Sequence, residues 1–138
     1  MSLVLCCHPG LGPSVKGTAL VARDNFSARY DLDRHKGIFS RPGHALFARS
    51  YVGKVLVLNT AKGGVASAWM MRDMAERGIV PAAFLFNRVN PILAQGAAFA
   101  NIALLDRFDG DITSLLKTGD ELTIEPERGC VTVLPRSI

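Results

Sequence analysis

A glycine pair between a predicted strand and a predicted helix is the part of this chain best suited to chemistry. The apolar run Val55 to Leu58 has the length and composition of a buried strand, and a helical pattern begins at about Val65. Gly63 and Gly64 stand between them, where small residues let a ligand approach the backbone closely. A strand, a glycine turn and a helix in this order aim free N–H groups at an anion.

Polar residues around this turn strengthen the prediction of an anion site. Lys62 adds a positive charge, Asn59 and Thr60 end the strand, and Ser67 places a hydroxyl in the first helical turn. The glycine spacing and ending differ from those of a P-loop. A plain tight connection would use the same two glycines, so both interpretations remain open.

A second strand is expected to bring further polar residues to the same place. The helix should run from about Val65 to Arg77, and Ala82 to Phe86 forms the next apolar strand. In such a β-α-β unit the two strands are parallel, and ligands bind where their carboxyl ends meet. Arg88 follows the second strand and is therefore a further candidate for the anion site.

One histidine and a cysteine-rich start are weaker candidates. His44 lies in a predicted turn, where it could bind a carboxylate or transfer a proton, or simply bond to the backbone. Cys6, Cys7 and His8 are adjacent, but they lack the spacing of a zinc or iron–sulfur site, so we expect no metal in this chain. Three cysteines without a secretory signal favour free thiols in a reducing compartment.

The composition indicates one globular domain over residues 1–138. Apolar residues make up 49% of the chain, charged residues 20%, and the net charge is +4. That charge suits an anionic substrate or partner, whereas scattered arginines and an aromatic fraction of 7% argue against nucleic-acid binding. No apolar run has membrane-spanning length, so we expect a soluble, cytoplasmic protein.

The remaining elements predict an α/β domain in which a β-barrel or sandwich portion packs with a β-α-β core. The segment 27–35 is polar and is expected to be a surface loop. Residues 91–100 and 112–116 are expected to form short helices, the second of them capped by Asp111. Further strands are expected at residues 17–22, 37–39, 102–105, 121–125 and 130–134, the last two as a hairpin.

The order of these pieces resembles the small swivelling domain of the aconitase X family over most of the chain. The matching pieces are Gly17-Thr18-Ala19-Leu20-Val21, Gly43-His44, Gly53-Lys54-Val55-Leu56-Val57, Lys62-Gly63, Pro91-Ile92, Gly96-Ala97, Gly119-Asp120 and Gly129. The resemblance implies a hydro-lyase that dehydrates a small hydroxy acid, such as cis-3-hydroxy-L-proline or mevalonate 5-phosphate. It also implies a partner large subunit, whose cysteines hold an iron–sulfur cluster over which the small domain closes.

The chain departs from the family pattern at one position. In the family a serine that acts as general base follows the glycine matched by Gly63, whereas this chain has Gly64. Ser67 lies about one helical turn further on and is a possible substitute. Two functions therefore stay open: the small subunit of a dehydratase, and a binding or regulatory module that kept the anion site but lost catalysis.

Overall fold

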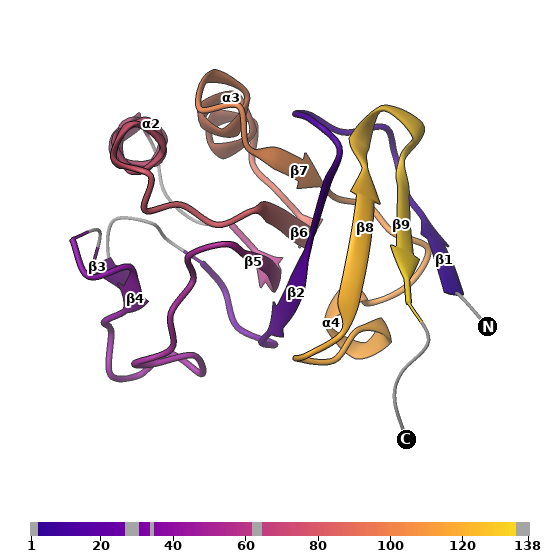
Figure 1. Cartoon of the computed structure of the whole chain (residues 1–138), viewed down its shortest axis with the longest axis horizontal. Helices are drawn as coiled ribbons and strands as arrows, with labels where there is room; N and C mark the ends of the chain where they lie inside the picture. Colours follow the sequence, from indigo (N-terminus) through magenta and orange to yellow (C-terminus); the bar gives the residue numbers. More distant parts are fainter. Residues whose placement is uncertain (1–2, 27–30, 34, 62–64, 135–138) are drawn as a thin grey trace.

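The computed structural model describes residues 3–26, 31–33, 35–61 and 65–134. A seven-stranded sheet dominates it, in the order β1-β9-β8-β2-β5-β6-β7 (Figure 1). β2 pairs with β5, β5 with β6 and β6 with β7 in parallel, whereas the pairs β2–β8, β8–β9 and β9–β1 are antiparallel. The strands are β1 (Leu3–Cys6), β2 (Val15–Val21), β5 (Lys54–Thr60), β6 (Ala83–Arg88), β7 (Ala103–Leu105), β8 (Glu121–Glu125) and β9 (Cys130–Val133).

The two edges of this sheet meet, which makes it a barrel. The chain that follows β1 reaches β7, where Leu11 and Leu104 exchange backbone hydrogen bonds of 3.0 Å. Inside lies an apolar core to which every strand contributes; its buried members include Val55, Val57, Leu85, Leu105, Leu122, Ile124, Val131 and Val133. Alternate side chains point inward along each strand, as the pleat requires. The predicted barrel portion is confirmed.

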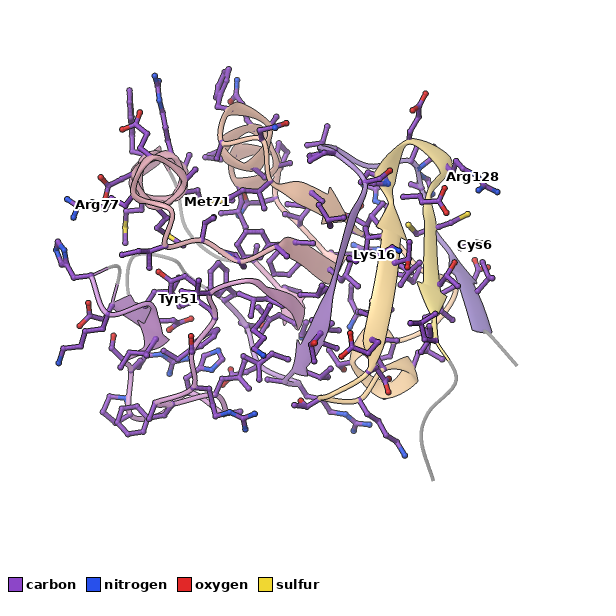
Figure 2. The ribbon with its side chains drawn as sticks, in the orientation of Figure 1. Cys6, Lys16, Tyr51, Met71, Arg77 and Arg128 are labelled. Atoms are coloured by element: carbon purple, nitrogen blue, oxygen red, sulfur yellow. The ribbon has the colours of Figure 1, made fainter. Side chains whose placement is uncertain are left out.

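Two helices cover the outer face of the parallel strands. α2 (Val65–Arg77) and α3 (Pro91–Phe99) lie side by side above β5, β6 and β7 (Figure 1). Met71 of α2, labelled in Figure 2, packs on the residues of β5 and β6 that point out of the barrel, such as Leu56 and Phe84. The predicted β-α-β core and the start and end of its helix are confirmed.

The contact between the two helices depends on a small residue. A Cβ added to Gly96 of α3 would lie 2.7 Å from the Cα of Ala68 in α2, which is too close for any real side chain. Gly96 therefore allows the helices to pack backbone against backbone. On the solvent side of α2, Arg72 pairs with Glu76 at 3.4 Å and Arg77 pairs with Asp73 at 3.1 Å, as their i, i+4 spacing predicts.

The prediction of a surface loop is wrong for residues 31–33. β3 (Leu32–Asp33) pairs with β4 (Ile38–Phe39). Leu32 and Phe39 are buried in the apolar core between the sheet and α2, the same core that contains Met71. The charges around Leu32 hide this signal, because buried Asp31 is neutralised by an ion pair with Arg41. Residues 27–30 and 34 of that segment lie outside the described residues.

The antiparallel strands end in a hairpin, as predicted, and a short helix lies beside the parallel ones. A 3₁₀ turn, η1 (Pro126–Arg128), and Gly129 join β8 to β9. α4 (Ile112–Leu115) contacts β5 and β6, and Asp111 caps it as expected, since its side chain accepts a hydrogen bond from the Thr113 N–H at 3.0 Å. Within the described residues, no helix combines the length and apolarity needed to cross a membrane.

Candidate functional site

Two asparagine side chains meet at the carboxyl edge of the parallel strands. Asn59 is near the end of β5 and Asn87 is near the end of β6. The Asn87 Nδ2 group donates to Asn59 Oδ1 at 3.1 Å. Because β5 and β6 are parallel neighbours, their polar ends necessarily lie together, so the predicted site edge is present in the fold.

Asn25, in the loop that leaves β2, extends this row of amides. Its Oδ1 atom accepts hydrogen bonds from Asn59 Nδ2 at 3.3 Å and from Thr60 Oγ1 at 2.5 Å. Backbone bonds hold the same loop, since the Asn59 N–H donates to the Asp24 carbonyl and the Phe26 N–H donates to the Thr60 carbonyl. No local sequence pattern predicts a role for Asn25 in this site. Its position after a strand parallel to β5 is the signal that could have identified it.

Asp111, beside α4, completes the row on the other side. Asn87 donates to Asp111 Oδ1 at 2.8 Å, and Asn87 Oδ1 accepts from the Ile112 N–H at 2.8 Å. The hydrogen bonds from Thr113 and Asn87 lower the pKa of Asp111 from 3.8 to about 2, because they stabilise its carboxylate. Asn87 thus ties α4 to β6, a link that the predicted capping role of Asp111 did not include.

His44 lies behind this row and is buried. Its Nδ1 atom accepts from the Leu46 N–H at 3.0 Å, so the proton of a neutral ring is on Nε2, which donates to the Asn25 carbonyl at 3.0 Å. Carboxylate oxygens of Asp24 and Asp31 lie 3.9 Å from Nε2. The ring therefore fixes the backbone of the Asn25 loop, which is the turn-histidine role that its sequence position also allowed.

Arg88 is placed where the β-α-β prediction put it. It is the last residue of β6, it is exposed, and its Cα partner on β5 is Thr60. In the part of the chain that the structure describes, its guanidinium has no hydrogen-bond or ion-pair partner. Lys62, Gly63 and Gly64, and the side chain of Ser67, lie outside the described residues; the chain enters them from Ala61, directly after Thr60.

The described part of the edge offers amide, hydroxyl, guanidinium and carboxylate groups, the last from Asp111. Among the described residues, no group of three or more His, Cys, Asp and Glu could hold a metal ion. The three cysteines are free thiols away from this edge: Cys6 ends β1, Cys7 follows it and Cys130 begins β9. Amide, hydroxyl and guanidinium groups gathered in this way can donate hydrogen bonds to an anion.

Comparison with known proteins identifies the domain. Residues 4–133 match the aconitase X swivel domain. The chain belongs to the aconitase X swivel-domain family. A phosphomevalonate dehydratase small subunit from Methanothrix thermoacetophila is 33% identical over 129 residues, which cover 94% of this chain and 93% of the relative. The corresponding small subunit from Methanocella arvoryzae is 29% identical over 90% of this chain and 94% of its own.

A solved structure of the family has the same fold. The crystal structure of Thermococcus kodakaraensis aconitase X in its holo form superimposes with a TM-score of 0.90 at 25% identity. The superposition covers 96% of this chain and 99% of that chain. The α/β fold predicted for a swivel domain is thus confirmed, with a mixed sheet, two helices on one face and a barrel interior.

Proposed function

We propose that this chain is the small subunit of an aconitase X-type hydro-lyase that dehydrates mevalonate 5-phosphate or a closely related anionic hydroxy acid. One observation carries the proposal: the chain aligns over nearly its full length with separate small subunits of phosphomevalonate dehydratases. The net charge of +4 fits a substrate that carries a carboxylate and a phosphate, as does Arg88 at the site edge, whose guanidinium has no partner among the described residues.

The reaction defines what the small subunit must do. Dehydration removes a proton from the carbon beside the carboxylate and expels hydroxide from the next carbon. A protein must therefore hold the anionic ends, place a base at the proton and exclude competing water. The Gly63 and Gly64 N–H groups, Lys62 and Arg88 bind the anionic groups in this proposal, and Asn59 and Thr60 orient them.

Ser67 is the proposed base in place of the family serine. A hydroxyl has a high pKa, so it accepts a proton only if the alkoxide is stabilised. The N-terminus of α2 and the charge of Lys62 supply that stabilisation in this proposal. Asn25, Asn59 and Asn87 have a positioning role in this proposal. Their hydrogen bonds hold the carboxyl ends of β2, β5 and β6 in place relative to one another.

The iron–sulfur cluster belongs to the large subunit in this proposal. Three thiols on β1 and β9, one of them turned into the barrel, do not fit a cluster, and the described carboxyl edge offers no thiolate. Cluster iron in such an enzyme acts as a Lewis acid on the leaving hydroxyl. The small subunit alone is therefore expected to be inactive.

The flank of α2 and α3 is the proposed contact for the large subunit. Trp69 and Phe99 are 64% and 72% exposed, and with Ile92 and Arg72 they border a groove of about 250 Å³ between the helices. Exposed apolar residues gathered in this way are typical of protein interfaces. Both helices begin at the carboxyl edge of the sheet, where Asn90 bonds to the Ala61 carbonyl, so a partner on this groove would border the site.

Co-expression with an aconitase X-type large subunit tests the proposal. We expect the two chains to elute together from a size-exclusion column and to dehydrate mevalonate 5-phosphate only when both are present. Trp69→Ser should weaken the complex without changing the melting temperature of the isolated chain, and Val4→Ser on β1 is the matched exposed control. Failure of this chain to activate a large subunit that the Methanothrix small subunit does activate would contradict the proposal.

A specific observation keeps the non-catalytic module as the second candidate. Gly64 occupies the position of the family serine, so the chain could bind an anion without moving a proton. Gly64→Ser separates the two candidates. A gain of dehydration from none would indicate an intact site that lacked only its base, whereas substantial turnover before the substitution would exclude the non-catalytic module.

A further inference from the structure

Two cysteines face each other across the β1–β9 edge of the barrel. Cys6 and Cys130 are direct partners in the antiparallel ladder. The Cys7 N–H donates to the Gly129 carbonyl at 2.9 Å, which makes Cys6 and Cys130 a pair without hydrogen bonds between them. In such pairs the Cα atoms are about 4.5 Å apart, within the range of roughly 4.4–6.8 Å that a disulfide spans.

Both of these side chains point out of the barrel. Their neighbours Leu5, Cys7 and Val131 pack against the interior core, so the pleat turns Cys6 and Cys130 to the outside. Cys6 is exposed and Cys130 is half-buried. The two sulfurs are thus on one face of the ladder, where a bond between them requires no change of strand register.

The surroundings of this pair suit thiol–disulfide exchange with a small-molecule disulfide. Cys6 is exposed, and it lines a pocket of about 290 Å³ together with Phe108, Asp109 and Leu115. Arg128 lies near Cys130, and Figure 2 shows the Arg128 side chain at the same edge as Cys6. The Arg128 guanidinium pairs with Glu125 at 3.0 Å, and the pKa of Arg128 is raised by this hydrogen bond and, to a smaller extent, by Cys130.

We propose that Cys6 and Cys130 form a reversible dithiol–disulfide site that reacts with small-molecule disulfides such as oxidised glutathione. The Cys6 thiolate attacks one sulfur of the reagent, forms a mixed disulfide and releases one thiolate. Cys130 then loses its proton to water and attacks the Cys6 sulfur, which expels the second thiolate. Two protein thiols are oxidised to one disulfide, and one small-molecule disulfide is reduced to two thiols.

Cys7 is excluded from this exchange by its position and provides the control. Its side chain turns to the interior and lies 3.2 Å from the His8 carbonyl, and burial is the main cause that raises its pKa to about 12. A thiol with such a pKa carries almost no thiolate at neutral pH. Cys7→Ser should therefore leave the reaction of the other two cysteines unchanged.

The test treats the folded full-length chain with oxidised glutathione, then unfolds it in urea together with an alkylating reagent that blocks the remaining thiols, and maps the peptides by mass spectrometry without reduction. We expect a Cys6–Cys130 linked peptide in the wild type and in Cys7→Ser, an alkylated Cys7 in the wild type, and a return to three alkylated cysteines after reduction. In Cys130→Ser, glutathione should remain attached to Cys6. The proposal is overturned if the wild type keeps Cys6 and Cys130 as free thiols or retains glutathione on Cys6. Thermal melts before treatment verify that each variant is folded.

Discussion

In the parallel half of the barrel, β2, β5, β6 and β7 run in one direction, and their carboxyl ends lie at a single edge. In the antiparallel half, β8, β9 and β1 alternate in direction, so successive strand ends lie at opposite edges. Asn25, Asn59 and Asn87 meet because they lie at or just beyond the carboxyl ends of parallel strands. The antiparallel half instead places residues in cross-strand pairs, such as Cys6 with Cys130. Parallel strands bring several polar groups from distant sequence positions to one edge, whereas antiparallel strands place residues opposite one another in pairs.

The largest expected effect is on catalysis in the parallel half. In the assembled enzyme, Ser67→Ala should lower kcat by roughly 10²–10⁴-fold with little change in KM, because it removes the proposed base. Ser50→Ala, an exposed serine in the β4–β5 connection, is the control and should keep full turnover. Thermal melts accompany the kinetics, since an early-turn hydroxyl can also stabilise a helix. Normal turnover in Ser67→Ala would place the base in the large subunit.

The halves should not differ in how they stabilise the fold, because they share one interior. Leu85 of β6 and Leu122 of β8 are both buried in it. Leu85→Ala and Leu122→Ala should each lower the free energy of unfolding by about 2–5 kcal/mol, through lost apolar burial and a cavity. Urea unfolding measures both. A loss below 1 kcal/mol for either one would show that its half packs less tightly than the barrel interior requires.

Loss of a polar side chain should lower the free energy of unfolding more in the parallel half than in the antiparallel half. Asn87→Ala removes the acceptor of the Ile112 N–H and the donor to Asp111, and should cost about 1–3 kcal/mol. Thr132→Ala on the outer face of β9 removes one side of the Thr123–Thr132 pair and should cost under about 1 kcal/mol. Equal losses in urea unfolding would mean that the amide row adds nothing beyond an ordinary cross-strand pair.

The smallest expected effect concerns acid. The pKa of Asp111 is lowered to about 2 in the folded chain, below its ordinary value of 3.8. The carboxylate therefore stabilises the fold above pH 4, and this contribution is lost as the pH falls toward 2. Melting temperatures between pH 5 and 2 should fall less steeply in Asp111→Asn than in the wild type. Parallel curves would show that Asp111 does not contribute to acid sensitivity.

The elements followed from patterns that act locally. The apolar run of β5, the helical pattern of α2 and the cap at Asp111 each predict one element from neighbouring residues. The strand at Leu32 could not be predicted in this way, because its burial depends on Phe39 and on the distant core. Asn25 was missed for the same reason: its partners, Asn59 and Thr60, lie more than thirty positions away.

The shared position of three candidate residues follows from the strand topology, whereas their role in ligand binding stays a prediction. Because β5 and β6 were predicted to be parallel neighbours, Asn59, Thr60 and Arg88 were expected at one edge, and the structure brings them there. The inward turn of His44 depends on hydrogen bonds from Leu46 and to the Asn25 loop, which no spacing in the sequence encodes. Ligand binding by Lys62, Gly63, Gly64 and Ser67 stays a prediction.

One pair of arginine variants tests the central claim, that the carboxyl edge of the parallel half binds the substrate. Arg88 ends β6 at that edge, whereas Arg128 lies in the hairpin turn of the antiparallel half and pairs with Glu125 at 3.0 Å. In the assembled enzyme, Arg88→Ala should raise the KM for mevalonate 5-phosphate about tenfold or more, since a charge-assisted contact contributes roughly 1.5–3 kcal/mol. Arg128→Ala should leave KM unchanged. A KM that rises in Arg128→Ala and not in Arg88→Ala would contradict the account.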